Sequence, residues 1–423
     1  MIENANDDAV VQIEYDDVLM PIHQSANISD IIGDLQKRRD TVISGGINCI
    51  PLPVPRFRSQ IPGIEQEQYV IVTAPTKCGK SQLSSYVYLY NALDYAFEHK
   101  DQCSVHIIYF SLEESYQRVL HRYMSHLLYK LDEIRISPQE LRSTSNDCPV
   151  SQEILDKFSL DQRYIDRLAF FEECVQFETE ETNPTGILRV CEEYAKKVGE
   201  YKTTKGYSRG NEFKEVDIFR SYKQHDPNHY KICFIDHSGL VDQERGMSLK
   251  QSMDKLSEYC VKYLRNRYKY TVVWIQQQAM EAEGLEAIKQ KRMLPAVATL
   301  GDTKYTARDC NIVLGLFDPS QFGLKNWLGY KIDDNGEGLK SHARFLYFLR
   351  GRDGEAGGVC PLFFDGATCT FEELPLPTDS LSLVNYYKRV KEMKTYKQSA
   401  KLSAIVGAII KQFFYGKKDK ESD

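Results

Sequence analysis

The most constraining feature of this sequence is a phosphate-binding loop placed directly after a buried strand. The strand is expected over residues 69–73, the loop occupies 74–81, and a helix is expected to about residue 98. The loop reads Ala-Pro-Thr-Lys-Cys-Gly-Lys-Ser, which fits the P-loop pattern with alanine in place of the first glycine. Strand, loop and helix in this order are the context that the pattern requires, so the sequence predicts a nucleotide-binding site.

The loop predicts both ATP and Mg²⁺ as cofactors. Gly79 lets the backbone approach the phosphates, Lys80 reaches the β- and γ-phosphates, and Ser81 offers its hydroxyl to Mg²⁺. The residues expected to bind the nucleotide are Ala74, Pro75, Thr76, Lys77, Cys78, Gly79, Lys80, Ser81 and Gln82.

Two carboxylates at strand ends are candidates for the remaining chemistry. The apolar run 231–236 ends in Asp236, which we expect on the magnesium side of the site. Glu113 follows the strand 105–111 at the carboxyl edge, where parallel sheets bind ligands, and is the candidate general base. Glu114, beside it, is interpreted as a carboxylate at a helix start.

Three consecutive amides close another buried strand, at Gln276, Gln277 and Gln278. One of them is a candidate sensor of the γ-phosphate. The alternative is that these amides only face a turn.

Alternating apolar runs and helical stretches predict an α/β fold. The early runs are continuous and apolar, as in strands buried on both faces of a parallel sheet, whereas the last two flank the glycine-rich segment 351–358 and predict a hairpin. We therefore expect a mainly parallel central sheet flanked by helices, with an antiparallel edge hairpin. The predicted strands are 69–73, 105–111, 168–171, 232–236, 271–276, 312–317, 345–350 and 360–365.

Composition divides the chain into four predicted segments. Residues 1–25 are acidic and are expected to be disordered. Residues 26–56 hold a short amphipathic helix and a proline-rich linker; the apolar face of this helix either packs on another body or folds back on its own domain. An ATPase domain is expected over 57–375, with polar insertions at about 141–165 and 199–229, followed by a basic helical tail over 376–423.

Charge, cysteine usage and hydropathy limit the other classes of function. A net charge of −6 argues against non-specific coating of nucleic acid but permits a local basic groove. The 11 cysteines include no CxxC pair, which argues against a disulfide framework or a cysteine zinc site. Neither a signal segment nor a membrane-spanning run is evident, so we expect a cytoplasmic protein without a membrane partner.

Taken together, these motifs resemble the RecA-like motor domain of DnaB-type replicative helicases. The matching stretches are 74–81, Phe-Ser-Leu-Glu at 110–113, Phe-Ile-Asp-His at 234–237, Trp-Ile-Gln-Gln at 274–277 and Leu-Arg-Gly-Arg-Asp-Gly at 349–354. The resemblance covers about residues 28–375 and is carried by the order and spacing of the set. It implies a homohexameric ring around single-stranded DNA, with ATP bound between subunits.

The resemblance also implies roles for further residues. Arg352 takes the place of an arginine finger that reaches the neighbouring γ-phosphate, with Arg350 beside it at the nucleotide in place of a lysine. Gln277 takes the place of the sensor glutamine. The helix at 28–39 corresponds to a linker helix that docks on the adjacent subunit.

A DNA-facing loop is implied around Gly301, Asp302 and Lys304. The family carries an arginine where this chain has Gly301, so one phosphate contact is missing. The candidates to replace it, as backbone contacts without base readout, are Lys289, Lys291, Arg292 and Lys304, and solvated surface charge is the alternative for each.

Other departures bear on partners and source. Only about 25 residues precede the linker helix, so we expect the family's N-terminal helical domain, which meets primase, to be missing. Gly239 stands where the family usually has glutamine. Primase or a helicase loader stays a partner class, and the small size suggests a bacteriophage replication protein in the cytoplasm of a bacterial host.

The leading hypothesis is an ATP-driven ring helicase that translocates on single-stranded DNA and unwinds duplex. One alternative is a non-unwinding RecA-like ATPase, such as a recombination mediator or helicase loader. Another is a DNA-binding scaffold with decayed hydrolysis. The presence of a complete set of hydrolytic residues argues against the last: Lys80, Ser81, Glu113, Asp236 and Arg352.

Overall fold

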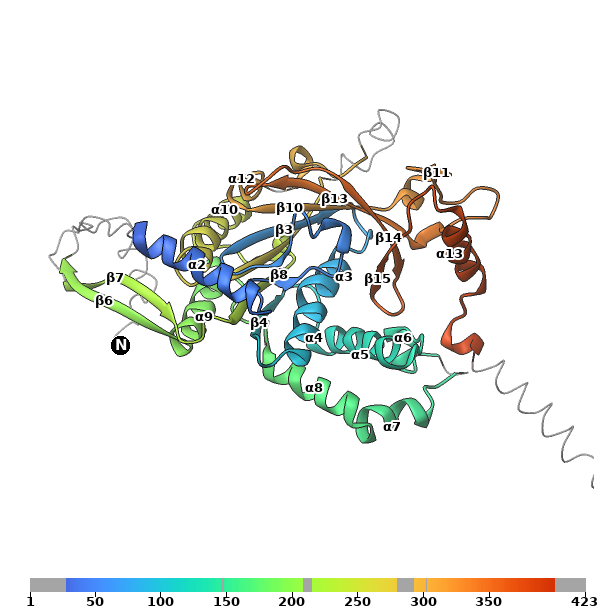
Figure 1. Cartoon of the computed structure of the whole chain (residues 1–423), viewed down its shortest axis with the longest axis horizontal. Coiled ribbons are helices and arrows are strands. Elements are labelled where there is room, and N and C mark those ends of the chain that lie inside the picture. Colours follow the sequence, from blue (N-terminus) through green and yellow to red (C-terminus); the bar gives the residue numbers. More distant parts are fainter. Residues whose placement is uncertain (1–27, 146–147, 208–214, 280–292, 302, 400–423) are drawn as a thin grey trace, which may run out of the picture.

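A nine-stranded sheet forms the centre of the protein, in a computed structural model that describes residues 28–145, 148–207, 215–279, 293–301 and 303–399 (Figure 1). From β10 to β5 the neighbouring strands are parallel, whereas β13, β14 and β15 are antiparallel. The predicted α/β class, with a mainly parallel sheet and an antiparallel edge hairpin, is confirmed. The order is β15 (Thr370–Glu373), β14 (Val359–Asp365), β13 (Ala343–Gly351), β10 (Ile312–Phe317), β3 (Gln68–Ala74), β9 (Thr271–Gln277), β8 (His229–Asp236), β4 (Ser104–Ser111), β5 (Val175–Glu178).

Helices cover both faces of this sheet, because the strand side chains alternate between two apolar cores. Val70 and Val72 of β3 pack into one core, and Tyr69 and Ile71 pack into the other. The first core is covered by α3 (Lys80–Ser84), a π-helical turn (Ser85–Tyr90), α4 (Asn91–Glu98), α5 (Tyr116–Asp132) and α8 (Gln162–Cys174). The second is covered by α9 (Pro184–Lys197), α10 (Leu249–Tyr259) and a π-helical turn (Cys260–Arg265).

Several smaller elements lie outside the sheet and the helices that cover it. They are β1 (Ile50–Pro51), β2 (Gly63–Ile64), α6 (Pro138–Leu141), α7 (Gln152–Leu160), α12 (Tyr305–Asp309), β11 (Asn326–Trp327) and β12 (Tyr330–Lys331). The described residues include no helix long and apolar enough to cross a membrane.

One strand prediction is wrong, because residues 168–171 lie inside α8. The buried positions of α8 are Tyr164, Arg167, Phe171 and Cys174, which have helical rather than alternating spacing. A short apolar run does not distinguish a strand from a buried turn of helix. The edge strand β5 begins directly after this helix and was not predicted.

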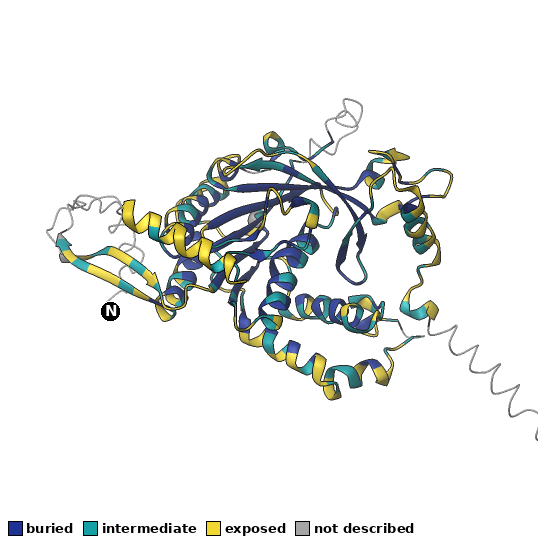
Figure 2. Ribbon diagram, viewed as in Figure 1, coloured by how far each residue is buried: buried dark blue, intermediate teal, exposed yellow. Residues whose placement is uncertain are grey.

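The described part of the polar segment 199–229 is mainly a two-stranded ribbon instead of an irregular loop. Its strands are β6 (Gly199–Tyr207) and β7 (Glu215–Gln224), and the ribbon projects from the domain with much of its surface exposed (Figures 1 and 2). Its root is anchored on the domain by two ring contacts: the ring centroids of Tyr222 and Tyr268 lie 5.4 Å apart, and the guanidinium of Arg267 lies 4.0 Å from the centroid of the Phe219 ring. The other predicted insertion, 141–165, is largely helical and contains α7.

A buried lysine beneath this ribbon predicts a pH-dependent stability. Lys231 donates to the Tyr222 hydroxyl at 2.9 Å and to the Gln224 side chain, and burial, aided by the charge of Lys269, lowers its pKa from 10.5 to about 7. Between these values the unfolded chain binds a proton that the folded chain does not. Raising the pH from 7 towards 10 should therefore stabilise the protein relative to Lys231→Met, by up to about 1.4 kcal/mol per pH unit.

Urea unfolding of both proteins at pH 7, 8 and 9 measures this difference. The exposed Lys262→Met serves as the control for loss of a positive charge at the surface. Parallel pH profiles for the parent protein and Lys231→Met would contradict the prediction.

The predicted amphipathic helix is present as α2 (Ile28–Ile43), and it buries none of its residues (Figure 2). Its apolar stripe is at least half exposed, at Ile28, Ile31, Ile32 and Leu35. Arg38 tethers the helix, since its carbonyl accepts from Asn48 at 2.8 Å and its side chain lies 3.6 Å from Glu65. The alternative in which this stripe packs on its own domain is wrong for the described chain.

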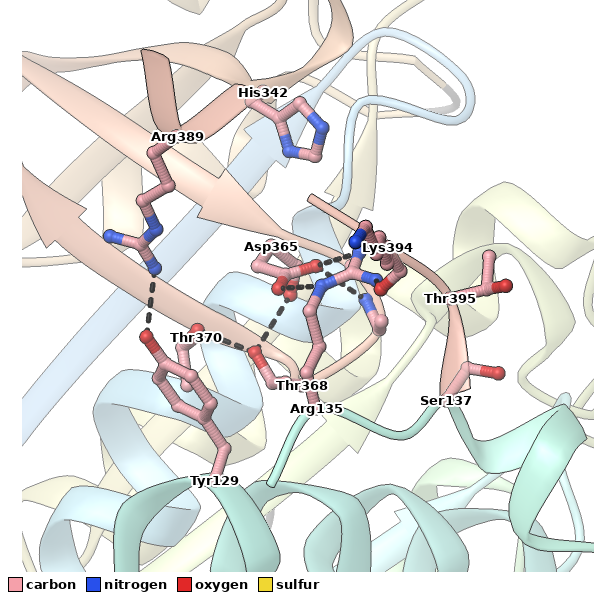
Figure 3. Close-up of polar contacts among 12 residues, drawn as sticks. Tyr129, Arg135, Ser137, His342, Asp365, Thr368, Thr370, Arg389, Lys394 and Thr395 are labelled. Carbon is pink, nitrogen blue, oxygen red and sulfur yellow. Dashed lines mark hydrogen bonds and ion pairs between the residues drawn. The ribbon is translucent and has the colours of Figure 1, made fainter. Parts of the chain in front are cut away.

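The start of the basic tail is fixed to the domain through two arginines, Arg135 and Arg389 (Figure 3). Arg135 binds the Asp365 carboxylate at 2.7 and 2.9 Å and the Lys394 carbonyl at 2.8 Å. Arg389 of α13 (Ser380–Glu392) binds the Glu372 carboxylate at 2.7 and 2.8 Å. Residues 400–423 of the predicted tail and the segment 1–25 lie outside the described residues.

Candidate nucleotide-binding site

Sheet topology brings the predicted site residues to one edge. The carboxyl ends of β3, β9, β8 and β4 are neighbours, with Ala74 paired to Gln277 and Ser111 paired to Asp236. The loop 75–79 leaves β3 at this edge, and Glu113 follows β4 two residues past its end. Ligands bind at the carboxyl edge of parallel sheets, so the arrangement is that of a ligand site.

The loop has the backbone of a phosphate cradle. Gly79 has a φ of +96° and Lys77 a φ of +62°, so left-handed residues flank Cys78. The helix begins at Lys80 with Gly79 as its N-cap, and no side chain caps it. Its first N–H groups are therefore oriented for an anion, and the Lys80 side chain is largely buried beside them.

The predicted magnesium residues are in contact. The Ser81 hydroxyl donates to one Asp236 oxygen at 3.0 Å, and the Tyr109 hydroxyl donates to the other at 2.9 Å. Burial raises the pKa of Asp236, while the two hydrogen bonds and the positive charge of Arg122 oppose this shift.

One carboxylate and one hydroxyl fit Mg²⁺, which takes its other ligands from phosphates and water. No group of three or more His, Cys, Asp or Glu side chains in the described parts of the chain is arranged for a metal. Tyr109 was not predicted; its sequence signal is only a hydroxyl within the apolar run of residues 107–110 in β4.

Glu113 is the accessible carboxylate of the site. Its side chain is 57% exposed, and its oxygen lies 3.6 Å from Nε2 of His237. The Gly239 N–H donates to Nδ1 of His237 at 3.2 Å, so the proton of the neutral ring is on Nε2 and faces Glu113. His237 therefore lies beside the candidate base, although the sequence did not single it out as a site residue.

Glu114 is held by the protein itself. It forms an ion pair with Arg122 of α5, and its N–H donates to the Ser111 hydroxyl at 3.3 Å. It directly precedes Ser115, the N-cap of α5. These contacts agree with its interpretation as a carboxylate at a helix start.

Of the three amides, only Gln277 is open to a ligand. The Gln276 amide donates to the carbonyls of Gly301 at 2.6 Å and Thr303 at 2.8 Å. The Gln278 amide donates to the Thr73 hydroxyl at 2.7 Å. No described residue hydrogen-bonds the Gln277 side chain, which alternation places on the other side of the strand. Its role as a sensor stays a prediction.

The predicted arginine finger, Arg352, lies at the other end of the strands from the phosphate loop. β13 ends at Gly351, which pairs with Ile312 at the start of β10, and Ile312 pairs with Val70. From Val70 to Ala74, where the loop begins, is about 13 Å at roughly 3.3 Å per residue. Arg352 is exposed and donates to the Arg308 carbonyl at 2.7 Å, and half-buried Arg350 lies on the same side. Neither arginine lies at the loop of its own chain.

The predicted DNA-facing segment is joined to the end of β9. Gly301 donates its N–H to the Gln277 carbonyl at 2.9 Å, while the Gln276 side chain binds the segment as described above. Lys304 is exposed at the start of α12. The other predicted DNA contacts, Lys289, Lys291, Arg292 and Asp302, lie outside the described residues.

Comparison with known proteins identifies the fold. No family model matches the chain, and no curated protein matches it by sequence. The chain aligns with the solved structure of a DnaB-like replicative helicase, which was studied together with its interactions with primase. The alignment covers 84% of this chain and 68% of the helicase, with a TM-score of 0.57 and 13% identity. A second solved structure, an isolated ATPase domain of a phage helicase, aligns over 83% of this chain and 100% of its own, with a TM-score of 0.55 and 13% identity. The chain therefore has the RecA-like fold of the DnaB-type helicase ATPase domain.

Proposed function

We propose that this protein is an ATP-dependent replicative DNA helicase of the DnaB type, a ring-forming motor that translocates on single-stranded DNA and unwinds duplex. One observation carries the proposal: the phosphate loop lies at the carboxyl ends of the parallel strands, and the predicted arginine finger lies at their amino ends. A complete site then needs two chains in a head-to-tail arrangement, and such contacts form a ring when the rotation between neighbouring chains closes. The fold of the DnaB-like neighbours supports this assignment.

The chemistry follows from the residues at the two ends of the strands. Lys80 and the N–H groups of the loop hold the phosphates, with Mg²⁺ at Ser81 and Asp236 neutralising phosphate charge when bound. Glu113, beside His237, accepts the proton of the attacking water. Arg352 of the adjacent copy, with Arg350 beside it, stabilises the charge that develops on the γ-phosphate.

Hydrolysis is proposed to reach DNA through the end of β9. Gln277 reads the γ-phosphate, while its carbonyl and the neighbouring Gln276 side chain hold the segment at Gly301. A shift of this strand end would move Gly301, Asp302 and Lys304 against the DNA backbone, with Lys289, Lys291 and Arg292 as further contacts. The exposed stripe of α2 docks on the adjacent subunit of a homohexamer, and primase or a helicase loader is the proposed external partner.

A strand-displacement assay on a forked duplex tests the function, with electron microscopy of the protein bound to an ATP analogue and a single-stranded oligonucleotide. We expect ATP-dependent displacement and a closed ring with DNA in its pore. ATP hydrolysis in rings without displacement would favour the non-unwinding ATPase, and monomers under these conditions would contradict the ring. Lys80→Ala is the inactive control.

A further inference from the structure

A buried ion pair lies directly behind the phosphate loop. Arg344 of β13 is 4% exposed and Asp318, just past β10, is 2% exposed; their side chains are 2.8 Å apart. The same guanidinium donates from Nε to the carbonyl of Cys78, in the middle of the loop, at 2.6 Å. Burying two charges is costly even when they pair, so a buried pair is weak evidence for a role in stability alone.

Other groups from the same side of the sheet support this part of the loop. The Cys78 thiol lies 3.4 Å from the Gln321 amide oxygen. The ring of Phe364, on β14, lies 4.8 Å from the Arg344 guanidinium, and it would be 3.5 Å from a Cβ added at Gly79. The middle of the loop therefore packs against side chains from β13, from β14 and from the turn that follows β10.

The hydrogen bond from Arg344 fixes the direction of a phosphate-binding group. The Cys78–Gly79 peptide is trans and planar, so its carbonyl and its N–H point in opposite directions. Because the carbonyl is held towards β13, the Gly79 N–H is turned away from β13, towards the space in front of the loop. A rotated peptide would instead present a carbonyl oxygen to the phosphates and repel them.

We propose that Arg344, held by Asp318, is a positioning residue for the nucleotide: it locks the Cys78–Gly79 peptide so that the Gly79 N–H faces the phosphates. The guanidinium is suited to this because it binds a carboxylate and a carbonyl at once from a planar fork. A lysine keeps the charge for Asp318 but has no second arm in a fixed geometry. The inference deepens the proposed ATP site and requires neither a ring nor unwinding.

Equilibrium binding of an ATP analogue with Mg²⁺ to the full chain tests the proposal. Arg344→Lys is expected to weaken binding by at least about tenfold, the loss of one charge-assisted hydrogen bond. In steady-state hydrolysis, KM should rise by the same factor while kcat changes less. The matched control is Arg167→Lys, a mostly buried arginine of α8 that binds the carboxylates of Asp94 and Glu98 and should leave nucleotide binding unchanged.

A second variant separates positioning from stability. The double variant Arg344→Met, Asp318→Leu removes both buried charges. Its melting temperature is expected to be close to that of the parent protein, because apolar replacement of buried ion pairs is often neutral or stabilising. Binding should stay at least tenfold weaker. Parental affinity in this double variant, or in a folded Arg344→Lys protein, overturns the proposal. Loss of strand displacement with parental affinity would count against the helicase function instead.

Discussion

An Arg352→Ala variant is expected to hydrolyse ATP roughly a thousandfold more slowly than the parent protein, the effect typical of a lost arginine finger. Each chain should bind ATP as before, because Arg352 lies at the other end of the strands from its own loop. Steady-state hydrolysis with saturating single-stranded DNA measures the loss, and binding of an ATP analogue measures the part that should not change. Arg308→Ala, an exposed arginine at the same end of the strands, is the control.

Mixing two inactive variants tests whether the finger acts between chains. Lys80→Ala retains its finger, and Arg352→Ala retains its loop. In randomly mixed head-to-tail rings about a quarter of the interfaces combine an intact loop with an intact finger, so an equal mixture should recover activity of that order. A mixture as inactive as its two components would show that the finger does not act in trans.

Replacement of Glu113 by glutamine is expected to have the second largest effect. Loss of a general base typically lowers the rate by about 10² to 10⁴, and glutamine keeps the size of the side chain while removing its basicity. ATP binding should be retained, because Glu113 is largely exposed and is not part of the loop. Single-turnover hydrolysis isolates the chemical step from product release.

The exposed Glu173→Gln, at the end of α8, controls for loss of a carboxylate outside the site. Glu114→Gln gives a contrast within the site: Glu114 is paired with Arg122, so its replacement should lower thermal stability more than the chemical rate. Full DNA-stimulated turnover in Glu113→Gln would show that another group is the base.

Local pattern was enough to predict most of the sheet and the first half of the site. The strands β3 and β8 are both buried and are followed by or end in polar residues, so Ser81 and Asp236 could each be predicted from the local sequence. The ion pairs and hydrogen bonds that orient the site were not predictable in this way. Tyr109 lies 127 residues from Asp236, and Arg344 lies 266 residues from Cys78, so only the order and register of the strands bring them together.

The sequence pattern gave wrong predictions where two kinds of secondary structure have similar amino-acid composition. The apolar run in α8 is shorter than the length over which helix and strand periods separate. The ribbon β6–β7 is polar because most of its surface faces solvent, and polarity alone predicted a loop. The position of Arg352 at the other end of the strands depends on the antiparallel pairing of β13 with β10, which no local segment encodes.

The placement of loop and finger at opposite ends of the strands also governs how the protein behaves on dilution. On the proposed function, a solitary chain keeps Lys80, Ser81 and Asp236 and so holds ATP without consuming it. Specific activity would then be constant at high protein concentration and would fall steeply once chains separate. Isolated chains would keep their ATP bound, and hydrolysis would begin only when two chains associate.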